Sequence, residues 1–377
     1  MNKLLKLPPL SLYIHYPWCL KKCPYCDFNS HEGKVHDGYI NALLKDLDND
    51  LEYVQNRKVN SIFIGGGTPS LMSVKDANDL FMGLKGRLDF VDNIEITLEA
   101  NPGTFEVDKF EEFRNLGINR LSIGVQSFKD EQLKFLGRIH SGIEALNAVS
   151  KAQSVGFDNI NIDLMYGLNG QSIDMCIEDL TKAIELNPNH ISFYQLTIEP
   201  NTLFSKFPPS LPLDEDIWEM GERGAELLNQ NGFNQYEVSA YSSEPSKHNL
   251  NYWEFGDYIG IGAGAHGKIT DMDTHKILRT LKLKSPKDYL LAVQNSKQIS
   301  SIKVIDSLSF EFMLNSLRLI DGFDPKLYEE RTGQSIKLLN SQMREAENLG
   351  LLDVGIHWIK PTKKGCSFLN ELQERFL

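Results

Sequence analysis

Residues 15–30 read HYPWCLKKCPYCDFNS and hold three of the chain's five cysteines. Cys19, Cys23 and Cys26 have the spacing CxxxCxxC and follow the short apolar run at 11–16, so we expect them in a loop directly after a β-strand. Five is an odd number and three of the cysteines are clustered, which argues against the disulfide framework of a secreted protein. The sequence therefore predicts a cytoplasmic protein whose clustered thiols bind a metal.

Two kinds of metal site fit three clustered cysteines. A structural zinc ion usually takes four protein ligands, so a zinc site needs a fourth ligand such as His15 or His31. A [4Fe–4S] cluster is held by thiolates, and three cysteines leave one of its irons open to a small molecule. The spacing alone keeps zinc as an alternative to the iron–sulfur cluster.

The first two hundred residues alternate between strand and helix patterns. Short apolar runs occur at 11–16, 61–67, 94–100, 120–127, 159–168 and 191–198, and stretches of helical periodicity lie between them. Repeated strand–helix units of this length predict parallel strands, and we expect a partial (β/α)6 barrel, with an open doubly wound sheet as the alternative. In both folds the carboxyl ends of the strands carry the binding groups.

The sequence predicts a division of the chain into three parts, the barrel and two that follow it. Residues 1–240 form the barrel, 241–300 a connecting segment with the motifs HNLNYW and GIGAGAH, and 301–377 a mainly helical module whose order of elements is winged-helix-like. The net charge of −12 argues against nucleic acid and against direct binding to anionic lipid. No apolar run is long enough for an integral membrane segment, and the first ten residues make a poor signal peptide.

The motif CLKKCPYC matches the signature of the radical S-adenosylmethionine (SAM) superfamily. From about residue 10 to its end the chain resembles the oxygen-independent coproporphyrinogen III oxidase group of that superfamily, through YIHYPWC, IGGGTPS, LEANP, LSIGVQSF, NIDLMYGL and HNLNYW. This group contains an oxidase type and a haem chaperone type. The oxidase type has a longer N-terminal segment and a fourth cysteine where this sequence has Phe28, so the resemblance to the chaperone type is closer.

The resemblance implies a [4Fe–4S] cluster on the three cysteines, with SAM bound to the open iron. Glycines let a backbone approach its ligand, carboxylates and amides accept hydrogen bonds from hydroxyl or ammonium groups, and a guanidinium suits a carboxylate. The residues expected to bind SAM are Tyr13, Tyr25, Gly66, Gly67, Thr68, Glu99, Gln126, Arg138 and Asp163.

The resemblance also implies haem as a ligand, with haem-accepting respiratory proteins as partners, a homodimer, and a place at the membrane periphery through the acceptor. We expect His248 to bind the haem iron, because Tyr252 and Trp253 beside it could stack on a porphyrin. His266 is a second candidate, and a structural role for both histidines is the alternative. The alternative function is oxidative decarboxylation of coproporphyrinogen III by a 5′-deoxyadenosyl radical.

Overall fold

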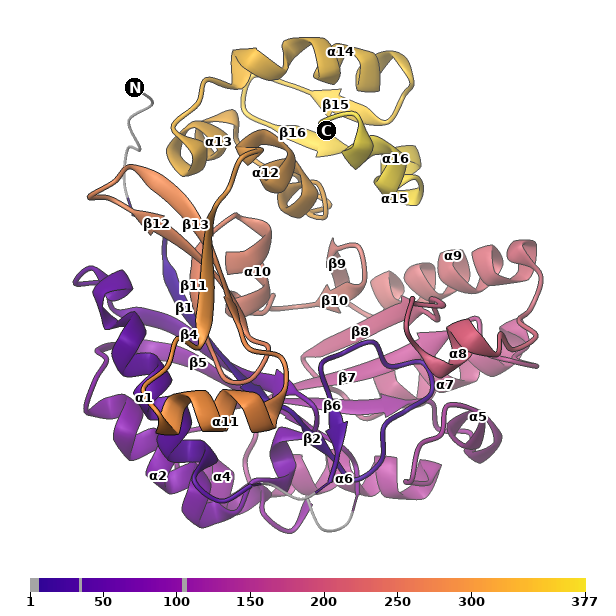
Figure 1. Ribbon diagram of the computed structural model, residues 1–377. Helices are drawn as coiled ribbons and strands as arrows, with labels where there is room; N and C mark the ends of the chain where they lie inside the picture. The colour runs from indigo at the N-terminus through magenta and orange to yellow at the C-terminus, as the bar shows by residue number, and fades with distance from the viewer. Residues whose placement is uncertain (1–6, 34–35, 104–106) are drawn as a thin grey trace.

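The computed structural model describes residues 7–33, 36–103 and 107–377. Its centre is a curled twelve-stranded sheet in which six parallel strands lie side by side in chain order (Figure 1). These strands are β1 (Leu10–Tyr16), β4 (Val59–Gly66), β5 (Phe90–Ala100), β6 (Arg120–Gln126), β7 (Asn159–Tyr166) and β8 (His190–Gln195). They correspond to the six apolar runs of the sequence, so the predicted partial (β/α)6 barrel is confirmed.

Helices connect the parallel strands and cover the outer face of the sheet (Figure 1). They are α1 (Tyr39–Asp50), α2 (Val74–Lys85), α4 (Phe110–Asn115), α5 (Asp130–Phe135), α6 (Gly142–Ser154) and α7 (Ile173–Glu185). Two further helices, α8 (Leu203–Lys206) and α9 (Asp214–Gln230), follow β8. Serine N-caps begin three of them, and at α6 Ser141 and Glu144 form a reciprocal capping box. Most residues of these strands are buried, and in β6 and β7 apolar residues alternate with polar residues that line the pocket.

The sheet continues with strands from the second half of the chain. β11 (Asp257–Ile261) pairs parallel with β1, and β12 (His266–Asp271), β13 (Lys276–Lys282) and β14 (Ser300–Val304) follow in antiparallel order. At the other edge, β10 (Ala240–Ser242) joins β8 to β9 (Asn234–Glu237). The segment predicted as a connection thus extends the barrel sheet, and its boundaries at 240 and 300 stay predictions.

The last seventy residues form a mainly helical module with its own apolar core around Phe312 and Tyr328. Its elements are α12 (Leu308–Ser316), α13 (Pro325–Thr332), α14 (Asn340–Asn348), the hairpin β15 (Leu352–Val354) and β16 (Ile359–Pro361), α15 (Lys363–Ser367) and α16 (Leu369–Glu374). Two other helices lie outside this module: α10 (Lys247–Trp253) packs against β4, and α11 (Pro286–Gln294) packs against α1. Within the three described ranges, no helix is both long and apolar enough to span a bilayer.

Candidate functional site

The cysteine loop crosses the carboxyl end of β1. Cys19 ends the short strand β2 (Trp18–Cys19), which pairs in parallel with β3 (His31–Glu32). The amide of Cys26 donates to the carbonyl of Cys23, and the amide of Thr68 donates to the carbonyl of Trp18. These main-chain bonds hold the loop against the turn that follows β4.

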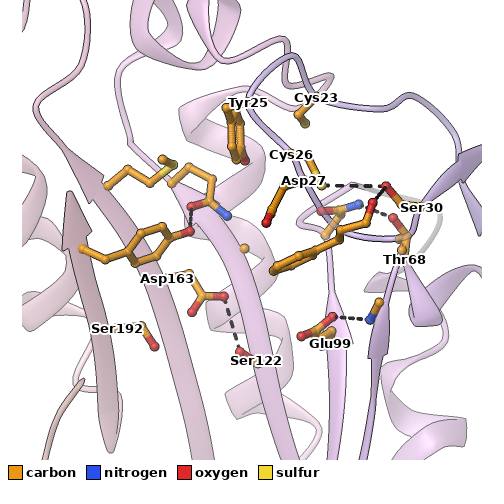
Figure 2. Close-up of a pocket in the computed structure, with 18 of the residues that line it drawn as sticks. Cys23, Tyr25, Cys26, Asp27, Ser30, Thr68, Glu99, Ser122, Asp163 and Ser192 are labelled. Atoms are coloured by element: carbon orange, nitrogen blue, oxygen red, sulfur yellow. Dashed lines mark hydrogen bonds between the residues drawn. The ribbon is translucent and has the colours of Figure 1, made fainter. Parts of the chain in front are cut away.

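All three cysteines line one pocket of about 460 Å³ at the carboxyl ends of the parallel strands. Eight other residues predicted from the sequence line the same pocket: Tyr25, Gly66, Gly67, Thr68, Glu99, Gln126, Arg138 and Asp163. Figure 2 shows Cys23 and Cys26 at one end of this pocket, Ser122, Ser192 and Glu99 at the other, and Asp163 between the two ends. Residues that are far apart in the sequence are therefore brought together in one pocket, and their roles as ligands stay predictions.

Burial raises the pKa of the Cys19 and Cys26 thiols, so the ligand-free pocket favours their protonated form. A metal can replace these protons, because the thiolate is the ligating form of cysteine. Among the described residues, no group of three or more His, Cys, Asp and Glu side chains is arranged to hold a single ion. His15, offered as a fourth zinc ligand, has both ring nitrogens in hydrogen bonds, to Tyr13 Oη and to the Asn29 carbonyl.

Two half-buried carboxyl groups, Glu99 and Asp163, line the pocket. The backbone amide of Gly66 donates to Glu99 Oε2 at 3.0 Å, but burial and the neighbouring charge of Asp163 raise the pKa of Glu99 to about 7. Burial also raises the pKa of Asp163, although Asn161 and Ser122 donate hydrogen bonds to it. Because a buried anion is stabilised by an opposite charge, this part of the pocket favours a cationic ligand.

Arg138 lies at the cysteine end of the pocket. Its Nη2 donates to Asn101 Oδ1 at 2.5 Å and to the Gly124 carbonyl at 2.7 Å, and its Nη1 lies 3.7 Å from Cys23 Sγ. The Nε atom is buried and has no hydrogen-bond partner among the described residues. The guanidinium is thus held in place at the cysteine end of the pocket, where it could face an anionic ligand.

The two predicted glycines are required by packing. Gly66 has φ +115°, and a Cβ atom there would lie 2.5 Å from the His15 ring. A Cβ atom on Gly67 would lie 2.6 Å from the carbonyl oxygen of Trp18. Any side chain at these positions would push the β4 turn away from the cysteine loop, so the glycines keep the two walls of the pocket together.

Gln126 has a strained backbone. Its φ of 69° lies in the left-handed region, which a residue with a side chain seldom adopts. Its Oε1 accepts a hydrogen bond from Tyr194 Oη at 2.7 Å at the wall of the pocket. Strain of this kind gathers at ligand sites, where the surrounding fold holds a side chain in a required position.

Several lining residues were not predicted from the sequence. Asn101 donates to Thr68 Oγ1 and accepts from Arg138, so it links two predicted residues. The others lie on inward positions of β6, β7 and β8: Arg120, Ser122, Asn161, Ser192 and Tyr194. The alternation of strand side chains could have found them, because they are two or four residues from Gln126, Asp163 or one another.

Two predicted residues do not line the pocket. Tyr13 lines an adjoining hollow of about 580 Å³, which shares Gly66 and Glu99 with the first pocket and also contains the exposed His266. His248 is 2% exposed, its Nδ1 lies 2.9 Å from Ser61 Oγ, and its ring stacks on Phe63. The predicted binding of haem iron by His248 therefore stays a prediction.

Comparisons with known proteins agree with this geometry. A model of the radical SAM superfamily matches residues 13–183. The solved structure of coproporphyrinogen III oxidase (HemN) from Escherichia coli has a TM-score of 0.83 at 23% identity, covering all of this chain and 91% of that one. The class of the protein is thus defined by a radical SAM domain in a HemN-like fold.

Full-length relatives give the particular family. The chain is 49% identical over 381 residues to "Heme chaperone HemW" of Escherichia coli (strain K12), covering 99% of this chain and 100% of that protein. It is 48% identical to the protein of the same name from Haemophilus influenzae, and 32% identical to that of Bacillus subtilis (strain 168), over 99% and 97% of this chain. The chain belongs to the HemW family.

Each cysteine of the loop should be required for an iron–sulfur cluster. We expect Cys19→Ala, Cys23→Ala and Cys26→Ala to lose most of the iron and sulfide that the wild type retains after anaerobic reconstitution, because each substitution removes one of three thiolate ligands. Iron and sulfide analysis with visible absorption spectra measures this. Cys366→Ala, in the C-terminal module, is the control and should keep full occupancy. Equal loss in the control would contradict the assignment.

Proposed function

We propose that this protein is a haem chaperone that binds haem and transfers it to haem-accepting proteins. The observation that carries the proposal is 49% identity to a named haem chaperone over the whole chain, C-terminal module included. Cytoplasmic location, respiratory acceptors at the membrane and a homodimer form part of the proposal. The residue Phe28 supports it further, because an exposed phenylalanine at the pocket wall cannot bind iron as a fourth cysteine could.

The pocket suits a [4Fe–4S] cluster with SAM. Cys19, Cys23 and Cys26 would hold the cluster, which supplies an open iron for the amino and carboxylate groups of SAM when bound. Arg138 would donate to the SAM carboxylate, since its Nη1 lies 3.7 Å from Cys23 Sγ at the cysteine end of the pocket. The remaining pocket groups would contact the ammonium, the ribose or the adenine: Tyr25, Gly66, Gly67, Thr68, Glu99, Gln126 and Asp163. Tyr13 lies in the adjoining hollow, so its contact with SAM stays a prediction.

The raised pKa of Glu99 predicts that SAM affinity depends on pH. Below its pKa of about 7 this carboxyl is neutral, and above it the carboxylate attracts the cationic groups of SAM. We therefore expect the affinity to rise as the pH increases from 6 to 8, measured by anaerobic calorimetry. Glu99→Gln should bind SAM about tenfold more weakly at pH 8 and lose this rise.

The matched control for that experiment is Glu111→Gln, on the exposed side of α4, which should keep both the affinity and its pH dependence. Wild-type affinity that stays constant between pH 6 and 8 would remove Glu99 from the SAM site. Asp163→Ala should weaken SAM binding in the same assay, and unchanged affinity there would remove Asp163 as well.

We propose His248 as the ligand of the haem iron. Burial lowers its pKa to about 3, which keeps the ring neutral, and its Nε2 has no partner among the described residues. A neutral imidazole with a free nitrogen is the form that binds iron. His248→Ala should lose the Soret band that the wild type develops on addition of haem. His275→Ala, in an exposed turn, is the control, and wild-type binding by His248→Ala would place the ligand elsewhere.

An assay of haem transfer distinguishes the chaperone function from the oxidase function. Haem-loaded protein should give up its haem to an apo-cytochrome over minutes, followed by the shift of the Soret band. The reconstituted protein with SAM, a reductant and coproporphyrinogen III should form no vinyl groups. Vinyl formation without haem transfer would contradict the proposal and favour the oxidase, whose fold the chain shares.

A further inference from the structure

The guanidinium of Arg120 is buried without a counter-ion. Arg120 is 2% exposed, begins β6 and lines the pocket on the side away from the cysteines. Among the residues that the structure describes, none forms a hydrogen bond or an ion pair with this side chain. By contrast, Lys268 and Lys282, which are equally buried, lie 2.8 Å from Asp257 and 2.6 Å from Asp46. An unpaired buried charge is costly, so Arg120 needs an anion that the protein itself does not provide.

A second unpartnered donor lies next to Arg120. Thr97 and Arg120 are paired directly across β5 and β6, so their side chains are neighbours on the same face of the sheet. Thr97 Oγ1 is buried and has no partner among the described residues. Thr97 alternates along β5 with Glu99, which lines the pocket, so the hydroxyl points into the barrel. A guanidinium and a hydroxyl side by side are the donors that a carboxylate requires.

The surrounding residues do not supply this carboxylate. The positive charge of Arg120 acts to lower the pKa of Asp163. The Asp163 carboxyl nevertheless accepts its hydrogen bonds from Asn161 and Ser122 and forms no ion pair with the guanidinium. The positive charge of Arg120 also lowers the pKa of His248. The Nε2 atom of His248 is the third unpartnered polar atom near the floor of the barrel, which is the end where the parallel strands begin. Three unpartnered groups on three neighbouring elements indicate a site for a ligand rather than an isolated packing defect.

The ligand at Arg120 differs from SAM. Arg138 and the three cysteines lie at the opposite end of the pocket, and Gln126 at that end of β6 is six residues from Arg120, about 20 Å along an extended strand. SAM has a single carboxylate, which the cysteine end already attracts. The floor of the barrel therefore requires a second molecule with an anionic side chain.

We propose that Arg120 and Thr97 bind a propionate side chain of haem at the floor of the barrel. This inference rests on the proposed function, because haem is the ligand that a haem chaperone carries, and its two propionates are carboxylates on flexible arms. Arg120 then supplies the paired N–H donors and Thr97 a single O–H donor to the carboxylate.

The experiment compares haem with haem dimethyl ester, in which both propionates are esterified. The wild type should bind haem at least about tenfold more tightly than the ester, as measured by Soret titration of reconstituted protein. Arg120→Gln should lower the affinity for haem to that for the ester and leave the affinity for the ester unchanged. Arg120→Lys should restore part of the preference, and Arg87→Gln, which removes a surface guanidinium, should keep all of it.

Four outcomes would overturn this inference. If the wild type binds both porphyrins equally, or if Arg120→Gln keeps the preference for haem, no propionate binds at Arg120. Equal weakening of both porphyrins means that Arg120 shapes the fold, and a lost affinity for SAM means that SAM is its ligand. A wild type that binds no haem contradicts the proposed function itself, which separates that failure from the failure of this inference.

Thermal unfolding of the ligand-free Arg120→Gln variant gives an independent measurement. Because the substitution removes an unpaired buried charge, its unfolding midpoint should equal or exceed that of the wild type. A clear fall in the midpoint would mean that the guanidinium has a structural partner in the protein and would overturn the proposal.

Discussion

The parallel pairing of β1 with both β4 and β11 is the constraint on which the site depends. The register joins Tyr13 to Phe63 on one side and to Gly260 on the other, so the two halves of the chain meet at this strand. Because the cysteine loop follows β1 directly, the same hydrogen bonds fix the loop above the pocket. Asn29 in that loop donates to the carbonyls of Ala263 and Lys284, which extends the contact beyond the strands. A register shift of one residue in β1 would turn the side chains of this strand to the opposite face and displace the cysteine loop.

Buried charges divide into those that hold the fold and those that serve the site. Lys282 lies between Asp46 and Asp50, and this trio joins β13 to α1. Asp257 pairs with Lys268 and Arg57 and fixes the start of β11. Such pairs are complete without any ligand. The charges of the pocket are not, and perturbed, unpaired groups gathered in a cavity are characteristic of functional sites.

The sequence carries enough information for the six parallel strands and for the cysteine end of the pocket. β-Branched runs at regular spacing mark the strands, and Cys19, Glu99 and Gln126 stand at or just beyond strand ends. The floor of the barrel could not be predicted in the same way. Alternation along β6 marks Arg120 as an inward position, but no pattern in the sequence shows that its guanidinium lacks a partner. The addition of β11 to β1 depends on a pairing across about 250 residues, which no local pattern encodes.

One strand relates the two ends of the barrel to each other. The inward side chains of β5 are Glu95, Thr97 and Glu99, two residues apart. Glu95 accepts hydrogen bonds from Ser246 Oγ and from the amide of His248, and so holds the first turn of α10. Glu99 lines the pocket at the other end of the same strand.

Strand β5 couples the opening of α10 to ligand binding at Glu99. His248 Nε2 is enclosed by neighbours that include Phe63 and Tyr252, so iron can reach it only if α10 moves away from the barrel. Such a movement breaks the bonds to Glu95 and displaces the base of β5, which also carries Thr97 and Glu99. If haem binds at His248 and SAM at Glu99 as proposed, the two ligands act on the same strand, β5. Occupation of the pocket at Glu99 would alter the free energy of opening at α10, and by thermodynamic reciprocity haem would alter the affinity for the ligand at Glu99 by the same factor.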